Sequence, residues 1–190
     1  QSEIVSLHLD FVGDKVSTEG APSGYLERTT EKLCNSPYVT WHKGMGRTST
    51  MKVIAEGDIG LVWRKEELDS VPEISTKMLE YGIKGKPVIA NRNPINEGIL
   101  GSDYPLFAND SEDFKLKIML ALKDPNIYST AARTCYDASK KFTYTEICLN
   151  SIKPLLDSII TEVNIFPPRP DRFNVDWELA RISRAIGELS

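Results

Sequence analysis

The stretch ISTKMLEYGIKGKPVIA, residues 74–90, decides the fold because it joins a helix to a buried strand. Ser75 is a residue type that caps the amino end of helices, and Gly85 is the type that ends them. Pro87 then opens the apolar run PVIA, which is typical of a strand that is covered on both faces. The helix also displays a lysine and a glutamate just ahead of the turn, a placement that calls for a functional explanation.

Outward from this stretch, apolar runs alternate with helical patterns along most of the chain. We predict strands at 4–12, 38–42, 59–63, 87–90 and 105–107, and helices at about 25–34, 48–55, 75–85, 111–122, 125–140 and 145–160, the last one kinked at Pro154. Such alternation indicates a parallel sheet with helices on both faces. The predicted fold class is therefore α/β, a Rossmann-like, doubly wound parallel sheet of about six strands.

The chain then returns to a strand pattern where a closing run of helices would normally end a domain. VNIF at 163–166 reads as a strand, PPRPDRF as a loop, and Asp176 as the cap of a helix. That helix sets apolar residues at spacings of three and four, namely Leu179, Ile182, Ile186 and Leu189. We expect the 163–166 strand to pair inside the main sheet.

Residues 58–107, from DIGLVW to DYPLF, resemble the nucleotide-sugar-binding half of retaining GT-B glycosyltransferases of the family-4 type. The resemblance rests on a D-I-G-L strand, an S-x-K-x-x-E-Y helix and the G-K-P-V-I strand that follows it. Residues 4–57, with FVGD and VTWHKG, look like the preceding part of the same half. The combination is fairly specific, whereas each piece alone is weak.

Family members begin one strand–helix unit earlier, and residues 163–190 resemble that unit down to the R-P after its strand. We therefore expect circularly permuted order, with residues 1–162 as the main part of the domain and 163–190 completing its sheet. Permutation is tolerated where chain termini lie close together. The alternative is that 163–190 form an accessory tail.

The resemblance implies the strand order of the sheet: 38–42, 4–12, 163–166, 59–63, 87–90, 105–107. The order reverses between 163–166 and 59–63, and doubly wound sheets bind ligands at such a switch point, beyond the carboxyl ends of the strands. The loops expected there contain Gly13, Arg169 and Arg64. A nucleotide diphosphate is predicted to bind between them.

Transfer from a nucleotide-sugar needs cations and helix amides to stabilise the departing diphosphate. Arg169 is the first candidate, by resemblance and by its fork geometry, and Arg172 is a second; the alternative is a solvated loop arginine. Lys77, in the first helical turn, is predicted to contact phosphate together with the backbone amides of Ser75 to Lys77. Its alternative is a surface pair with Glu80, worth only a few tenths of a kcal/mol.

Glu80 is the strongest single candidate, because the glutamate of this motif in the resembled family accepts hydrogen bonds from the ribose hydroxyls. The alternative is an ion pair with Lys84. Many relatives carry a second glutamate eight positions earlier that faces the donor sugar. Here that position is Pro72, and Glu73 is one residue away, which puts the sugar contact in doubt.

The remaining candidates follow strand ends. Arg64 and Lys65 come directly after the 59–63 strand and are predicted to contact phosphate or base, with a solvated strand end as the alternative. Gly13 allows close approach of the backbone to a phosphate, or is a plain turn glycine. Asn91 and Asn93 follow the 87–90 strand and are expected at most to line the pocket.

Composition excludes several classes of function. A formal net charge of −4 over 190 residues gives no general attraction to nucleic acid. The three cysteines lack metal-site spacing, which suits a reducing cytoplasm, and neither histidine has an Asp/Glu/Cys cluster beside it in the sequence. We expect no metal, since no D-x-D pair occurs, and no cofactor. GMGRTST is not a P-loop, and no G-x-G-x-x-G opens a helix.

These observations predict the donor-binding half of a glycosyltransferase of the hexosyltransferase type, of the kind used in polysaccharide biosynthesis. The whole enzyme would transfer a sugar from a nucleotide-diphosphate sugar with retention. Because the chain begins with Gln, we expect a fragment, inactive alone, whose acceptor-binding domain is missing; membrane association would be peripheral and through that domain. The alternatives are a sugar-nucleotide epimerase of the same architecture and a non-catalytic α/β interaction module.

Overall fold

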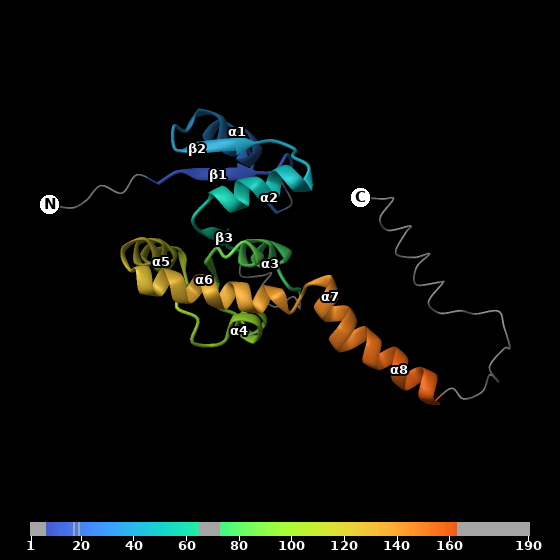
Figure 1. The fold of residues 1–190 in the computed structure, drawn as a ribbon. Coiled ribbons are helices and arrows are strands. Elements are labelled where there is room, and N and C mark those ends of the chain that lie inside the picture. Colours follow the sequence, from blue (N-terminus) through green and yellow to red (C-terminus); the bar gives the residue numbers. More distant parts are fainter. Residues whose placement is uncertain (1–6, 17, 19, 65–72, 163–190) are drawn as a thin grey trace. The chain divides into compact units, whose positions relative to one another are not determined.

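The computed structural model describes residues 7–16, 18, 20–64 and 73–162, with the backbone alone for 160–162 (Figure 1). The chain divides into two compact units, Gln1–Thr143 and Tyr144–Ser190. The described part of the first unit holds all the strands and the candidate site. The described part of the second unit is helical.

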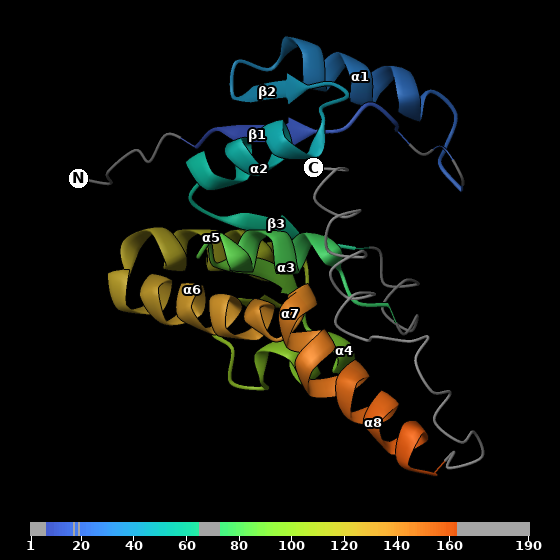
Figure 2. The same ribbon diagram turned by 45° about the vertical axis from the view of Figure 1, so that its right-hand side comes forward.

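A small parallel sheet opens the first unit. β1 (Leu9–Val12) pairs with β2 (Val39–His42), with Leu9 opposite Val39 and Val12 opposite His42. The helix between them, α1 (Tyr25–Asn35), lies alongside β2 (Figure 2). It begins after Gly24, whose φ of 73° is accessible to glycine at little steric cost. This pairing confirms the predicted neighbours 4–12 and 38–42.

The second sheet contains three parallel strands in the order β3 (Gly60–Val62), β4 (Val88–Asn91) and β5 (Phe107–Ala108). Every residue of β4 is buried, as the uninterrupted apolar run predicts for a central strand. The helices around it are α2 (Arg47–Glu56), α3 (Thr76–Ile83), α4 (Pro94–Leu100), α5 (Ser111–Lys123) and α6 (Pro125–Lys140). The predicted order 59–63, 87–90, 105–107 is confirmed.

Helices α3 and α6 pack against each other closely (Figures 1 and 2). Gly82 of α3 makes this possible, because a Cβ built on it would lie 2.1 Å from Ser139 Oγ and 2.4 Å from the Cys135 carbonyl oxygen. Ala131, Cys135 and Ala138 add small buried side chains from α6. The contact holds the carboxyl end of α3 against α6.

Two further contacts fix the strands. The buried Tyr104 hydroxyl donates to the Val88 carbonyl oxygen at 2.7 Å and accepts from the Val88 N–H at 3.0 Å. The hydroxyl thus supplies hydrogen-bond partners to backbone groups of β4 that β5 does not pair with, since pairing with β5 begins at Ala90. Gly60 of β3 lies under the ring of Tyr81, where a Cβ would come within 2.4 Å of the ring.

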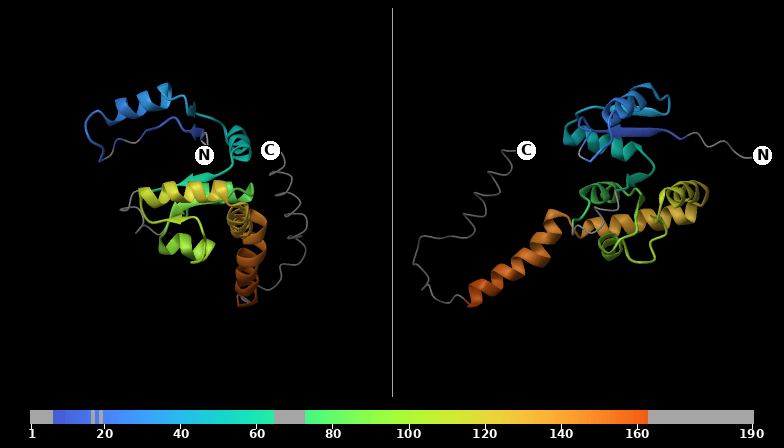
Figure 3. Two further views of the ribbon diagram at one scale, coloured as in Figure 1. Left: turned by 90° about the vertical axis from the view of Figure 1, so that its left-hand side faces the viewer. Right: turned by 180° about the vertical axis from the view of Figure 1, so that it is seen from behind.

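In the second unit, α7 (Tyr144–Ile147), the π-helical segment η2 (Cys148–Ile152) and α8 (Lys153–Glu162) form one continuous helical stretch (Figure 3). The wide π-type turn stands directly before Pro154. Proline has no N–H for the carbonyl of Asn150, so regular α-helical bonding is interrupted at this point. A π-helical segment thus precedes Pro154, and the kink at Pro154 itself stays a prediction.

The structure shows the predicted α/β class with parallel strands. The described strands form two sheets, of two and three strands, so a single sheet of about six strands stays a prediction. The strand expected to join the two groups, 163–166, lies outside the described residues. Helix α4 is not among the predicted helices. Among the described residues, no helix is long and apolar enough to cross a membrane.

Candidate functional site

An open hollow of about 270 Å³, a volume that includes space open to solvent, lies where β3 and β4 end. Its lining is mostly polar and comprises Val62, Arg64, Glu73, Ser75, Asn91, Asn93, Ile95 and Asn96. All of these side chains come from the carboxyl ends of the two strands or from the segments that follow them. This is the edge of a parallel sheet at which α/β proteins generally bind ligands.

The side chain of Asn91 forms one wall of the hollow. Its Oδ1 accepts a hydrogen bond from the Arg64 N–H at 2.7 Å, and its Nδ2 donates to the Arg64 carbonyl oxygen at 3.1 Å. The ladder between β3 and β4 has already ended at Val62 opposite Ala90. The amide of Asn91 therefore takes the place of a strand partner for Arg64.

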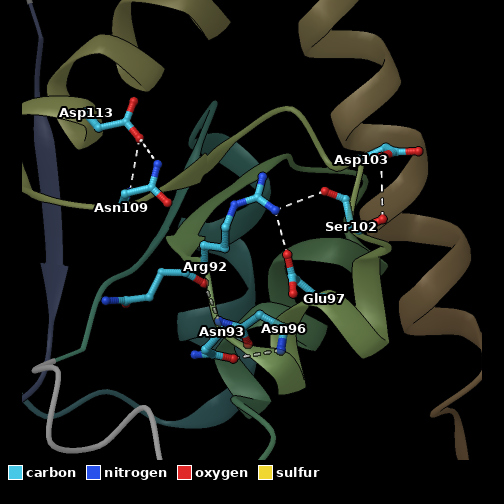
Figure 4. A network of polar contacts seen from close by, with 9 residues as sticks. Arg92, Asn93, Asn96, Glu97, Ser102, Asp103, Asn109 and Asp113 are labelled. Carbon is cyan, nitrogen blue, oxygen red and sulfur yellow. Dashed lines mark hydrogen bonds and ion pairs between the residues drawn. The ribbon is translucent and has the colours of Figure 1, made fainter.

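The segment after β4 is held by two further asparagines. Asn93 accepts from the Asn96 N–H at 2.8 Å and so caps α4, which has Pro94 in its first turn (Figure 4). The side-chain amide of the buried Asn96 donates to the Asn91 carbonyl oxygen at 2.8 Å. This asparagine network fixes the loop that borders the hollow.

Ser75 lies at the amino end of α3, between the hollow and the helix. Its side chain is only 5% exposed, and among the described residues its hydroxyl has no hydrogen-bond partner and makes no capping bond. The first turn of a helix also leaves amide N–H groups without intrahelical acceptors and carries partial positive charge. Hydroxyl and amides together offer donors to an anion that enters the hollow.

The charged residues of the lining face each other. Arg64 Nη1 lies 3.7 Å from Glu73 Oε2, and the Arg64 side chain is 26% exposed against 68% for Glu73. Such a solvent-exposed pair is weak, worth about 0–1 kcal/mol. Arg92, the next arginine along the chain, instead binds Glu97 and the Ser102 carbonyl oxygen (Figure 4). Arg64 is thus the cation that an anionic ligand in the hollow would meet.

Glu80 and Lys77 lie on α3 but do not line the hollow. Glu80 Oε1 is 3.5 Å from Arg47 Nη1 of α2, so neither a pair with Lys84 nor one with Lys77 is its partner. Lys77 is exposed in the first turn of α3, and no described residue forms an ion pair with it. Tyr81, beside Glu80, is half-buried, and burial with the neighbouring carboxylate raises its pKa.

Gly13 follows β1 in the two-stranded sheet and also does not line the hollow. Its N–H donates to the His42 carbonyl oxygen at 3.1 Å, and its carbonyl oxygen accepts from the Trp41 indole at 2.6 Å. Arg169 and Arg172 lie outside the described residues, as do Lys65 and Pro72. Of the predicted site residues, the structure therefore brings together Arg64 and Glu73.

Asn91 and Asn93, which the sequence places directly after β4, both line the hollow. Ser75 and Asn96 contribute side chains that are not predicted from the sequence. Ser75 is recognisable in the sequence as a residue type that caps helices. The hydroxyl of such a residue is normally expected to accept a hydrogen bond from a backbone N–H of the helix. Asn96 carries no signal, because it lies in the first turn of α4, a helix that is not predicted from the sequence.

The hollow presents groups that can donate hydrogen bonds to an anion. Arginine, hydroxyl and helix amides are donors, and the asparagine amides are engaged with backbone groups. Among the described residues, no group of three His, Cys, Asp or Glu side chains could hold a metal ion. Both histidines lie elsewhere, His8 on Thr40 at 2.8 Å and His42 on Asp10 at 2.7 Å.

The sequence matches no protein-family profile, and a comparison with curated proteins finds no relative. The resemblance to glycosyltransferases therefore depends on the motifs quoted above.

Proposed function

We propose that this chain binds a nucleotide-diphosphate sugar and is the donor-binding part of a glycosyltransferase. The observation that carries the proposal is the meeting of three features at the carboxyl edge of a parallel sheet: Arg64, the amino end of α3, and the Ser75 hydroxyl, which has no hydrogen-bond partner among the described residues. A diphosphate needs such a set of donors around its oxygens. The S-x-K-x-x-E-Y motif, whose resemblance suggests this enzyme class, begins at this edge with Ser75, whereas the G-K-P-V-I motif leads into the opposite end of β4.

In this proposal, the diphosphate binds at the amino end of α3, with Arg64 on one side and Lys77 reaching in from the first turn. Glu80 accepts hydrogen bonds from the ribose, which requires it to exchange its contact with Arg47 for the nucleoside. That exchange costs little because the Arg47 side chain is 81% exposed. Glu73 is the acid closest to the expected position of the donor sugar.

The sheet is proposed to be completed by residues 163–166, placed between β1 and β3. Each of these two strands is paired on one edge only among the described residues, which leaves an edge for a further parallel strand. Arg169 and Arg172 would then follow that strand toward the diphosphate, near Gly13. The two sheets would become a single doubly wound sheet of six strands.

The remaining parts of the enzyme are proposed to lie in an acceptor-binding domain that this chain does not include. The described hollow offers donors for a leaving diphosphate but no side chain poised to activate an acceptor hydroxyl. We therefore propose that this chain binds the donor without transferring the sugar, and that retention of configuration, a cytoplasmic location and independence of metal follow from the resembled family.

Isothermal titration calorimetry with UDP, GDP, dTDP and their sugar derivatives tests the proposal. We expect the nucleotides of one of the three bases to bind at 1:1 stoichiometry. Their affinity should fall as the salt concentration is raised, because salt screens charged contacts. A flat response to all of them would refute donor binding and favour the interaction module, for which the pairing of Glu80 with Arg47 is the supporting observation. Product analysis with the full-length enzyme separates a transferase from an epimerase.

A further inference from the structure

The bidentate contact between Asn91 and the backbone of Arg64 suggests a role that the motifs do not assign. We propose that Asn91 is a positioning residue, which holds Arg64 in the place where its guanidinium meets a diphosphate in the hollow. This inference rests on the proposed function. It deepens that proposal by naming the residue on which the geometry of the diphosphate cation depends.

The contact is specific in its geometry. Asn91 is 8% exposed, and its side chain binds both the N–H and the carbonyl oxygen of Arg64, 27 residues away in the sequence. Its own carbonyl oxygen is bound by Asn96, so the residue is held on both sides. Rotation of the amide would break both hydrogen bonds to the part-buried backbone groups of Arg64.

The position of Arg64 needs such support because β3 ends at Val62. Two residues later, regular strand pairing no longer fixes the backbone, and residues 65–72 follow outside the described range. Among the described residues, the guanidinium itself has only the weak contact with Glu73, at 3.7 Å. Among the described contacts, the backbone clamp by Asn91 is therefore the strongest constraint on the position of the Arg64 backbone, from which the side chain extends. Pre-organisation of this kind lowers the entropy cost of binding.

Asn91 acts through Arg64 rather than by touching the ligand, because both polar atoms of its side chain already bind Arg64. A double-mutant cycle tests this distinction. Arg64→Ala keeps the backbone N–H and carbonyl oxygen that Asn91 binds, so the clamp persists without the guanidinium. Asn91→Leu removes the clamp and keeps the guanidinium.

Binding of UDP, GDP and dTDP is measured by calorimetry for the wild type, Asn91→Leu, Arg64→Ala and the double variant. We expect Asn91→Leu to weaken binding by about tenfold in the wild-type background and by less than about twofold in the Arg64→Ala background. Asn91→Leu should lower the melting temperature by the same amount in both backgrounds, since this decrease reflects only the loss of the backbone clamp. A merely structural role would not produce this split.

Tyr104→Phe is the matched control, because its hydroxyl also binds both backbone groups of one residue, Val88, at the opposite end of β4. We expect it to lower the melting temperature comparably and leave nucleotide affinity within about twofold. If Asn91→Leu does not fold, Asn91→Ser, which cannot reach both groups, takes its place. Hydrogen exchange of the Arg64 amide reports the clamp without ligand and should accelerate in either variant.

Equal weakening of nucleotide binding in both backgrounds would overturn the positioning role while leaving the proposed function intact. Unchanged exchange of the Arg64 amide in the Asn91 variants would overturn it as well. Absence of binding to all three nucleotides by the wild-type protein would overturn the proposed function, and the positioning role with it.

Discussion

Gly82 of α3 and Ser139 of α6 lie so close that a Cβ on Gly82 would come within 2.1 Å of Ser139 Oγ. The same Cβ would lie 2.4 Å from the Cys135 carbonyl oxygen, which cannot move without moving α6. The interface is thus set by backbone contact and not by interdigitating large side chains. It lies at the carboxyl end of α3, whereas Ser75 borders the candidate site at the amino end.

We expect Gly82→Ala to destabilise the protein by about 1–3 kcal/mol, because overpacking at a backbone contact outweighs the better helix propensity of alanine. Thermal or urea unfolding measures the change. Gly98→Ala in α4 is the matched control, since nothing lies within 4 Å of its added Cβ, and we expect it to be neutral or stabilising. Equal stability of Gly82→Ala and wild type would show that the two helices separate easily.

Ser75→Ala is expected to separate stability from binding. Its hydroxyl makes no capping bond, so the melting temperature should hardly change, whereas nucleotide-diphosphate affinity should fall by about tenfold or more, the value of a hydrogen bond to a charged group. Calorimetric titration with UDP, GDP and dTDP measures this. Ser129→Ala, whose exposed hydroxyl bonds its own helix, serves as control. A large stability loss with intact binding would instead identify the Ser75 hydroxyl as structural.

Glu73→Gln tests whether this carboxylate competes with the ligand for Arg64. Removal of its charge should tighten binding of the nucleoside diphosphates by up to about fivefold, because an exposed ion pair is worth no more than about 1 kcal/mol. If Glu73 also contacts the donor sugar, the sugar-bearing nucleotides gain less than the diphosphates do. Comparison of the two ligand classes by calorimetry measures the difference, and weaker binding of both classes would argue against competition.

Alkaline pH is expected to destabilise the fold through Tyr104 and Cys135. Burial raises the pKa of both groups above their ordinary values of 10.0 and 9.0, so the native state keeps protons that the unfolded chain releases. Stability is therefore unaffected below about pH 8 and falls as pH rises through 9 and beyond. Urea midpoints between pH 7 and 10.5 measure the slope, and Tyr104→Phe should make it shallower. A midpoint that is constant to pH 10.5 would contradict the burial of these groups.

The sequence predicts local structure well here because the signals are local. The apolar run PVIA, the cap residue Ser75 and the stop at Gly85 suffice to place α3 and β4, and the neighbour order of the described strands follows from alternation. The signal for α4 is also local, an asparagine cap followed by Pro94, but the helix is only seven residues long and is easily read as a loop.

Contacts between residues that are far apart in the sequence cannot be predicted from such local patterns. The amide of Asn91 reaches Arg64 across 27 residues, and the Tyr104 hydroxyl reaches Val88 across 16. Nothing in the composition around an asparagine or a tyrosine indicates that it will replace a missing strand partner. For the same reason Glu80, chosen from a motif, finds Arg47 of another helix as its partner in place of the lysines near it in the sequence.

Gly60, which packs against the ring of Tyr81, limits the registers in which β3 can pair with β4. A ladder of only three residue pairs between β3 and β4 could slide by two positions at little cost in hydrogen bonds. Sliding would bring Asp58 or Val62 under the ring, where even a single methyl carbon does not fit. The absence of a side chain at Gly60 therefore favours the observed strand register over registers shifted by two residues.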